Sequence, residues 1–400
     1  MDSNQPLKQR IQSIDTLRGL IMIIMTLDHC RDFLHFQGKE YAPTNMATTT
    51  VILFFTRWIT HYCAPVFVFL SGVSAHLASL RRSGSGLSRF LVTRGLWLIL
   101  TDMLVISFIF TLNPHYDIVV LEVLWATGCS LILLALLVHT PLWVIACIGC
   151  LIFFGHNLLD YLHPAATGGA STALTLLLTA QGSVIPVDGQ HTIVVLYAAL
   201  PWAGLSLLGY VFGSLYRPGA DPRRCRRVLL YTGIALTGLF IVLRWLNGYG
   251  NPVPWSVQRN AAHTLLSFLN ATKQPPSLTY FSMTLGPALI LLALLEDNNT
   301  GVRSAKTRLA GICRTYGTVP YFYFVVHLFL IRAINLVLIL VFGIEMRCDG
   351  HPLVWQAPEF GIPLWGVYLT WALVVIALYW PSRWFGGYKR ANRQWWLSYL

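Results

Sequence analysis

Charged residues are scarce in this chain. Of its 400 residues only 11% are Asp, Glu, Lys or Arg, whereas 55% are hydrophobic and 13% are aromatic. Soluble domains carry about 25% charged residues, so this composition excludes an ordinary soluble protein. Apolar runs of about 20 residues recur along the whole length, and each is long enough to cross a hydrocarbon core of about 30 Å. We therefore predict a polytopic membrane protein whose surroundings are the lipid bilayer.

Acidic residues are scarcer than basic ones. There are 16 Asp and Glu against 28 Lys and Arg, which gives a net charge of +12. Such a balance suits a nucleic-acid partner, but here the basic residues gather in short loops that alternate with nearly uncharged ones. That alternation is the positive-inside signature of membrane topology, so no nucleic-acid partner is expected. It predicts two cytosolic termini and a multi-pass protein of the inner, cytoplasmic membrane.

Several well-known sequence motifs are missing. The chain has no P-loop, no GxSxG, no dinucleotide fingerprint and no metal-ligand spacing such as HExxH, so no metal site is expected. The eight cysteines are scattered, and the CxxC of Cys147 and Cys150 lies in an apolar segment, which favours packing over metal binding. No disulfide framework is predicted. No small-residue cleavage site follows the first apolar run, which we interpret as a retained helix.

The apolar runs predict an all-α bundle of about ten transmembrane helices. Pro65 lacks a backbone hydrogen-bond donor, so the second segment is expected to be kinked or split there. We find no internal repeat and no soluble domain, and residues 1–400 are expected to form a single integral-membrane domain. The expected helices are 14–36, 50–80, 88–112, 118–138, 141–162, 193–215, 228–246, 278–296, 317–343 and 363–380.

The first helix is unusual in its ionisable side chains, which are Asp28, His29, Arg31, Asp32 and His35. A charge in a bilayer core is costly, so such residues normally face a protein interior or a wet cavity. Eleven residues make roughly three helical turns, so Arg18 and His29 share one face of this helix. The same stripe holds Asp15, Met22, Met25 and Asp32. One face of the first helix is therefore expected to line something polar.

His29 is the leading candidate for chemistry. A carboxylate close to an imidazole raises its basicity and fixes its tautomer, as a general base near neutral pH requires. Asp32 lies one turn further on and is expected to reach His29. Asp28 points elsewhere, so it is expected to orient a substrate or to pair with an Arg of another helix. A purely structural, hydrogen-bonding His is the alternative.

Other ionisable residues lie in apolar segments further along the chain. Arg57 and His61 are four residues apart and share a face, where they serve either as substrate contacts or as interfacial anchors. Glu122 and His327 are expected to face a substrate pocket inside the bundle. His327 lies some seven residues after Pro320, which is expected to start a helix. Snorkelling at a helix end is the alternative for each isolated residue. The candidate substrate-binding residues are thus Arg57, His61, Glu122 and His327.

The segment from Arg18 to His29 resembles the first helix of the transmembrane acyltransferase superfamily. In its acyltransferase-3 sugar O-acetylases this helix reads Asp-x-Leu-Arg-Ala, followed by a His at the spacing that separates Arg18 from His29. That His is regarded as catalytic. The chain is more closely similar, nearly end to end, to bacterial proteins with the heparan-α-glucosaminide N-acetyltransferase catalytic domain. The segments that carry this likeness are 13–19, 63–72, 200–202, 275–278, 319–327 and 395–400.

The resemblance implies an acetyl-CoA-dependent enzyme. It would pass an acetyl group from cytosolic acetyl-CoA to a hydroxyl or amine of an acceptor, a sugar or glycan, at the extracytoplasmic side. The catalytic residues would be His29, Asp32 and Asp28. The anionic CoA would be held by Arg18, Arg89 and Arg94. The lysosomal sugar N-acetyltransferases carry Asn where this chain has His29, with their catalytic His further on, so His35 stays open as the base.

A proton-coupled transporter of a small solute is the competing hypothesis. Intramembrane Asp, His and Arg also serve proton relays, and the break at Pro65 is similar to the discontinuous helices of transporters. The lack of a repeat relating two halves argues against it. A sensor or scaffold that binds the donor without turnover is a third hypothesis. The acceptor, the acyl-chain length and the formation of a homo-oligomer stay open from sequence.

Overall fold

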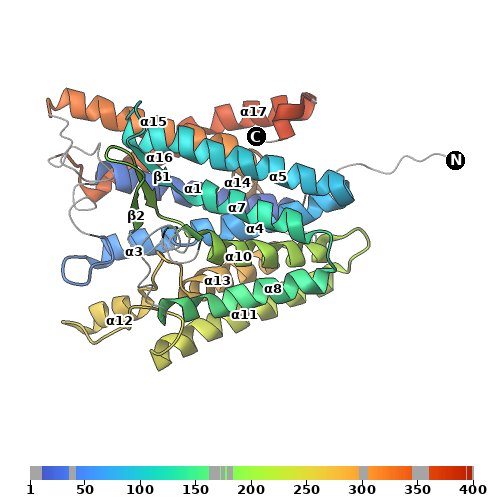
Figure 1. Ribbon diagram of the computed structural model, residues 1–400. Helices are drawn as coiled ribbons and strands as arrows, with labels where there is room; N and C mark the ends of the chain where they lie inside the picture. Colours follow the sequence, from blue (N-terminus) through green and yellow to red (C-terminus); the bar gives the residue numbers. More distant parts are fainter. Residues whose placement is uncertain are drawn as a thin grey trace.

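The computed structural model describes residues 11–35, 42–161, 172, 176–177, 183–296, 305–344, 360–392 and 394–398. Most of its helices lie side by side along one direction (Figure 1), which confirms the all-α membrane bundle. The longer helices are α1 (Gln12–Leu34), α3 (Val51–Thr60), α4 (Cys63–Ser79), α5 (Gly84–Leu100), α7 (Val123–Leu137), α8 (Leu142–Gly155), α10 (Ala199–Gly213), α11 (Pro222–Leu246), α12 (Ala261–Leu269), α13 (Leu278–Glu296), α14 (Ala305–Gly317), α15 (Pro320–Val341), α16 (Leu364–Ala377) and α17 (Tyr379–Ala391). Shorter helical pieces are η1 (Thr101–Ile106), α6 (Ser107–Thr111), η2 (His156–Tyr161), η4 (Ser214–Tyr216) and η6 (Trp395–Ser398).

The number of membrane crossings agrees with the sequence. Within the described residues, 8 helical segments are long and apolar enough to cross a membrane. Helix α1 has 23 residues, which corresponds to a rise of about 35 Å, and α7 is shorter but apolar. With these two the bundle has about ten crossings. Both ends of the chain, and the prediction that they are cytosolic, lie outside the described residues.

The second apolar segment is split in two, as Pro65 predicts. Helix α3 ends at Thr60 and α4 begins at Cys63. Pro65 lies in the first turn of α4, where the missing N–H has no helical partner to lose. At the other end of α3, Thr50 Oγ1 accepts a hydrogen bond from the backbone N of Leu53 at 3.2 Å. The split places the residues between α3 and α4 next to the middle of α1.

Two segments predicted as helix begin as β-strand instead. Strand β1 (Ile118–Leu121) replaces the start of 118–138, and β3 (Thr192–Val195) replaces the start of 193–215. With β2 (Ser183–Pro186) they form a sheet of order β1-β3-β2, in which β1 and β3 are parallel and β2 and β3 antiparallel. Runs of β-branched residues favour strands, and pairing satisfies their backbone groups. The sheet lies at one end of the bundle (Figure 1).

Three basic stretches that lie outside the expected helices are helical. The basic loop after 296 becomes α14, the cluster after Arg217 forms the first turns of α11, and the basic tail becomes α17. Asp221 Oδ1 caps α11 by accepting a hydrogen bond from the backbone N of Arg223 at 2.9 Å. An apolar run marks only the part of a helix inside the membrane, so it misses helical turns that extend beyond it. The start of α15 at Pro320 is confirmed.

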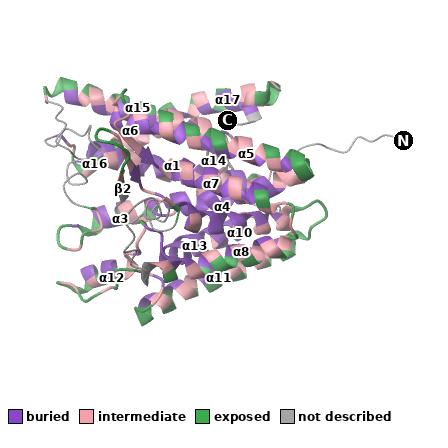
Figure 2. Ribbon diagram, viewed as in Figure 1, coloured by how far each residue is buried: buried purple, intermediate pink, exposed green. Residues whose placement is uncertain are grey.

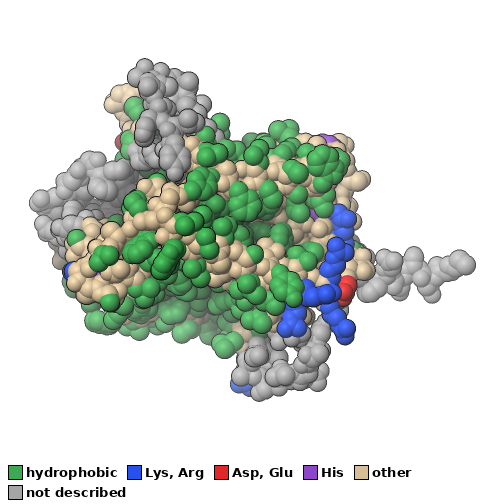
Figure 3. Space-filling model, turned by 90° about the horizontal axis from the view of Figure 1, so that it is seen from below, with side chains coloured by type: hydrophobic (Ala, Val, Ile, Leu, Met, Phe, Trp, Pro, Cys, Tyr) green, Lys and Arg blue, Asp and Glu red, His purple; other side chains and the backbone are tan. Residues whose placement is uncertain are grey.

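Lysine and arginine gather at the end of the bundle away from the sheet. Figure 3 shows them at one end of a face that is otherwise largely apolar. We call this the basic end. It comprises the α4–α5 and α10–α11 connections, the start of α11, α14 and the end of α17, with Arg81, Arg82, Arg217, Arg223, Arg224, Arg226, Arg227, Arg308, Arg314, Lys389 and Arg390.

The central helices pack backbone against backbone at glycines. Buried residues concentrate in α1, α4, α10 and α13 (Figure 2). A Cβ atom on Gly72 of α4 would lie 2.0 Å from the carbonyl oxygen of Ser206 in α10, and one on Gly209 of α10 would lie 2.1 Å from that of Phe69. Small residues at such crossings are typical of membrane helix pairs, which lack a hydrophobic driving force between them. This packing fixes α4, which carries one wall of the site.

Gly72→Ala is expected to lower the thermal unfolding midpoint of the detergent-solubilised protein. The new methyl group meets backbone, so the overpacking cost of about 1–3 kcal/mol cannot be relieved by a side-chain movement. Gly238→Ala is the matched control, because a Cβ on Gly238 of α11 meets nothing within 4 Å. That change should be neutral or stabilising, since alanine favours helix by about 1 kcal/mol over glycine. Equal midpoints for the two variants would contradict the close crossing.

Candidate active site

Ionisable residues along one face of α1 line two different cavities. Arg18, near the start of the helix, lines one cavity, and His29 lines the other. Arg18 Nη1 donates to Asp15 Oδ1 at 3.1 Å, and Arg18 Nη2 donates to Ser74 Oγ of α4 at 2.9 Å. Asp32 lines the same cavity as His29. The polar face predicted from helical periodicity is therefore confirmed.

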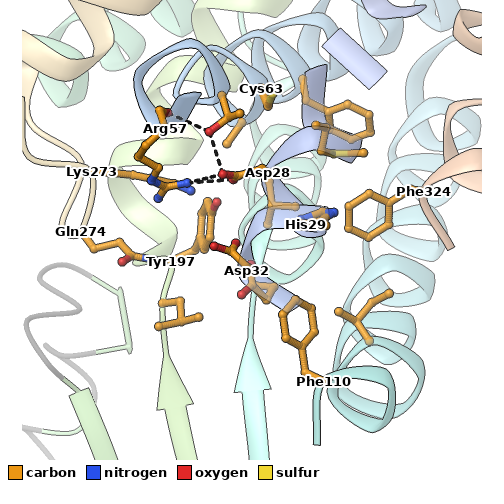
Figure 4. A pocket seen from close by; sticks show the side chains of 18 of the residues that line it. Asp28, His29, Asp32, Arg57, Cys63, Phe110, Tyr197, Lys273, Gln274 and Phe324 are labelled. Atoms are coloured by element: carbon orange, nitrogen blue, oxygen red, sulfur yellow. Dashed lines mark hydrogen bonds and ion pairs between the residues drawn. The ribbon is translucent and has the colours of Figure 1, made fainter. Parts of the chain in front are cut away.

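One of the two cavities, which we call the sheet-side cavity, has a volume of about 260 Å³. It lies among α1, α3, α4, α7 and α15, next to the ends of β1 and β3 (Figure 4). Its apolar walls include Phe33 and Phe110. Its ionisable and polar lining residues are Asp28, His29, Asp32, Arg57, Thr60, Glu122, Tyr197, Lys273 and Gln274. A small polar molecule would find both hydrogen-bond donors and acceptors there.

Asp28 forms a buried charge network at the wall of this cavity. Its Oδ1 accepts hydrogen bonds from Arg57 Nη1 and from Thr60 Oγ1, both at 2.7 Å, and Arg57 Nη1 also lies 2.8 Å from Oδ2 (Figure 4). Arg31 Nη2 lies 2.6 Å from Oδ1. The exposed fraction is 9% for the Asp28 side chain and 1% for Arg31. The predicted pairing of Asp28 with an Arg of another helix is confirmed.

His29 forms its hydrogen bond with a second histidine. His29 Nδ1 lies 2.7 Å from Nε2 of His327 in α15, and His327 Nδ1 lies 2.8 Å from the backbone oxygen of Tyr323. A carbonyl oxygen only accepts, so His327 Nδ1 carries a proton, and a neutral His327 then accepts at Nε2. His29 consequently donates from Nδ1 and keeps an unprotonated Nε2. That tautomer can accept a proton from a substrate.

The hydrogen-bond partner that the structure gives His29 differs from the predicted one. The sequence predicts that Asp32 holds His29 and that His327 faces the pocket. Instead His327 is fully buried and lines neither cavity, whereas Asp32 lines the sheet-side cavity with its Oδ1 2.6 Å from Arg31 Nη2. Helical periodicity orders the residues along one helix, but it does not reveal which residue of a distant helix faces them.

Two other predicted histidines lie outside the cavities. His61 is the C-terminal cap of α3 and keeps a helical backbone conformation four residues after Arg57. It is buried, its carbonyl accepts a hydrogen bond from Tyr280 Oη at 2.9 Å, and its ring lies 5.5 Å from that of Tyr280. His35 is the buried C-terminal cap of α1. Of His29 and His35, His29 is the one that lines a cavity.

Glu122 reaches the sheet-side cavity from just before α7, not from within a helix as predicted. The backbone N atoms of Glu122 and Trp125 donate to Asp102 Oδ2 at 2.7 and 2.9 Å. Asp102 comes from η1, a π-helical turn that continues α5, and such turns are frequent at functional sites. Burial raises the pKa of Glu122 to about 7, so both protonation states are populated near neutral pH.

Lys273 is a site residue that sequence reasoning missed. It lies in the connection between α12 and α13 and lines the sheet-side cavity together with Gln274 (Figure 4). Burial lowers its pKa. The available signal was a lysine two residues before Pro275 and Pro276 in a connection with few charges. No spacing rule links that position to His29, which is far away in sequence.

The other cavity, which we call the basic cavity, has a volume of about 370 Å³ and opens toward the basic end. Five cationic residues line it: Arg18, Arg81, Arg82, Arg94 and Lys389. The guanidinium carbon of Arg82 lies 4.1 Å from the ring centre of Phe90. Arg89 is exposed and does not line the cavity, so its predicted place beside Arg18 and Arg94 is wrong. It is five residues before Arg94 on α5 and therefore on another side of that helix.

The two cavities meet at a pair of aromatic rings. Phe67 of α4 and Phe324 of α15 are the described residues that line both. The ring centre of Phe324 lies 6.2 Å from that of His29, and Figure 4 shows the two side by side. No three His, Cys, Asp or Glu side chains in the described residues come together as a metal site.

A comparison with protein families gives a match. The family described as heparan-alpha-glucosaminide N-acetyltransferase, catalytic, matches residues 10–244. The chain belongs to this family. No curated protein matches the chain. Membership of the heparan-alpha-glucosaminide N-acetyltransferase family implies acetyltransferase activity in a multi-pass membrane protein.

The family match covers one part of the site. His29, Asp28, Arg57, Arg94 and Glu122 all fall within residues 10–244. Lys273 and Phe324, which line the cavities, and His327, which holds His29, come from later in the chain and lie outside the matched region. In this member of the heparan-alpha-glucosaminide N-acetyltransferase family, the fold brings residues from inside and outside the matched region together at one site.

Proposed function

We propose that the protein is an acetyl-CoA-dependent membrane acetyltransferase with the donor in the basic cavity and the acceptor in the sheet-side cavity. One observation carries the proposal: two cavities meet at Phe67 and Phe324, beside His29. The positive-inside rule favours a cytosolic basic end. The donor then enters from the cytosol, and the acceptor from the extracytoplasmic side of the cytoplasmic membrane.

The basic cavity suits the anionic end of CoA. Arg18, Arg81, Arg82, Arg94 and Lys389 line it, and guanidinium groups form strong, often bidentate hydrogen bonds with phosphate. Ser71, Ser74 and Thr127 also line the basic cavity, where they lie among apolar side chains. This mixture suits the pantetheine chain, which is itself partly polar and partly apolar. A thioester bound in this way would end at the junction between the cavities.

His29 is the general base of the proposed reaction. Its Nε2 takes the proton from the acceptor hydroxyl or amine, whose oxygen or nitrogen bonds to the acetyl carbonyl carbon. The C–S bond then breaks, and the imidazolium returns the proton to the departing CoA sulfur. His327 holds His29 in the required tautomer through the 2.7 Å hydrogen bond. The carboxylates of Asp28 and Asp32 line the same cavity and favour the transient imidazolium.

A small sugar or the terminal unit of a glycan suits the sheet-side cavity. Its volume of about 260 Å³ suits one such unit, and its many charged and polar groups suit a molecule with several hydroxyls. Arg57, with 16% of its side chain exposed, and Glu122 and Lys273 are the groups that would orient it. The attacking hydroxyl or amine belongs to the acceptor, so these residues do not decide which of the two it is.

Purified protein in detergent is expected to bind acetyl-CoA, and Arg94→Ala is expected to weaken that binding about ten- to hundredfold. A hydrogen bond to a charged group contributes about 1.5–3 kcal/mol, and the affinity should fall as salt screens the phosphates. Isothermal titration calorimetry gives the dissociation constants. Arg89→Ala is the matched control, because Arg89 is on the same helix but outside the cavity. A transporter of an unrelated solute would bind no acetyl-CoA, and an equal loss in both Arg variants would refute the proposed donor site.

A further inference from the structure

The two cavities share aromatic lining residues, and we call this place the junction. Phe67 and Phe324 line both cavities, and they come from different helices, α4 and α15. Phe324 is 4% exposed, and its ring centre lies 6.2 Å from that of His29 and 5.7 Å from that of His327. Phe324 thus packs edge to face against both histidine rings. Phe67 is only partly buried and lines both cavities from α4.

The reaction geometry places the acyl chain at this junction. The carbonyl carbon of a thioester has a sulfur, an oxygen and an alkyl group as substituents. The sulfur leads back into the basic cavity, and the attacking atom comes from the sheet-side cavity. The alkyl group is then left to lie against the rings that separate the two. A methyl group is the smallest alkyl group, and each further methylene would need more room beside these rings.

We propose that Phe67 and Phe324 set the acyl-chain length that the protein accepts, and restrict it to acetyl. The inference rests on the proposed donor site in the basic cavity. The two rings act as specificity-determining residues: they contact the alkyl group and leave the phosphate end of the donor untouched. In an apolar pocket one additional methylene changes discrimination by about 10–200-fold. Two additional methylenes therefore separate butyryl-CoA from acetyl-CoA clearly.

The test compares the dissociation constants of acetyl-CoA and butyryl-CoA, measured by calorimetry on the full-length protein in detergent. The wild type is expected to bind butyryl-CoA at least about tenfold more weakly than acetyl-CoA. Phe67→Ala is expected to bring the two constants to within about twofold of each other. Phe324→Leu, which keeps an apolar side chain beside His29, is the second variant and should narrow the ratio in the same direction. Unfolding midpoints verify that each variant is folded.

Phe90→Ala is the matched control. Phe90 lines the basic cavity but not the junction, so its loss should weaken both donors equally and leave their ratio unchanged. Equal affinities in the wild type, or a ratio unchanged in both junction variants, would overturn the inference while leaving the proposed function intact. Failure of the wild type to bind either donor would instead refute the proposed function itself.

Discussion

Replacing His29 with alanine is expected to lower the rate of acetyl-CoA turnover by about 10²–10⁴-fold, the usual contribution of a positioned general base. His29 lines the sheet-side cavity with Nδ1 held by His327, and it is absent from the basic cavity. Acetyl-CoA affinity should therefore stay close to that of the wild type. The release of CoA thiol by purified protein, with binding measured in parallel, separates the chemical step from donor binding.

His35→Ala is the control for this experiment, because His35 is the other histidine that the sequence offers as the base. It is buried at the end of α1 and lines neither cavity within the described residues. Its replacement should leave turnover within a few-fold of the wild type. An unchanged rate in His29→Ala, or a large loss confined to His35→Ala, would transfer the role of base away from His29.

Asp28→Ala is expected to destabilise the protein by about 3–5 kcal/mol, the usual cost of removing one partner of a buried ion pair. The change leaves the guanidinium group of Arg57 without its carboxylate and removes one of the two carboxylates that contact Arg31. Lys273 lines the same cavity and adds a further positive charge. The thermal unfolding midpoint in detergent and the fraction of monodisperse protein in size-exclusion chromatography measure the effect.

Asp32→Ala is the matched control for Asp28→Ala. Asp32 is on the same helix and contacts the same Arg31, but 41% of its side chain is exposed. Exposed ion pairs contribute about 0–1 kcal/mol, so this variant should unfold close to the wild type. The double variant Asp28→Leu, Arg57→Met should recover part of the lost stability, because it removes a charge together with its partner. An Asp28→Ala protein that is as stable as the wild type would show that the buried ion pairs of Asp28 do not stabilise the fold.

Much of the fold and one side of the site follow from sequence because both depend on local patterns. Apolar runs near the length of a membrane crossing marked the helices, and helical periodicity placed Arg18 and His29 on one face. The rarity of charge made Asp28 and Arg57 conspicuous. The strands at 118–121 and 192–195 were missed because four β-branched or apolar residues also fit the first turn of an apolar helix.

The remaining features depend on contacts between distant segments. The pairing of His29 with His327 joins α1 to α15 across 298 positions, and Lys273 reaches the same cavity from a connection with no motif. Arg89 and Arg94 looked equivalent as basic residues of one helix, yet only Arg94 lines the basic cavity. Neither periodicity nor composition specifies which helix packs against which, so these features required coordinates.

The unbroken run of α1 from Arg18 to His29 fixes the distance between a cation at one cavity and the base at the other. Eleven residues of α-helix rise about 16 Å, and tight packing on α14 at Gly19 prevents the helix from shifting. In the proposed reaction, a donor has to reach from one point to the other in a single piece. Acetyl phosphate, in which the phosphoryl and acetyl groups are adjacent, would occupy only one of them at a time. Under this proposal, the length of the helix sets the length of linker that the donor needs between its charged end and its thioester.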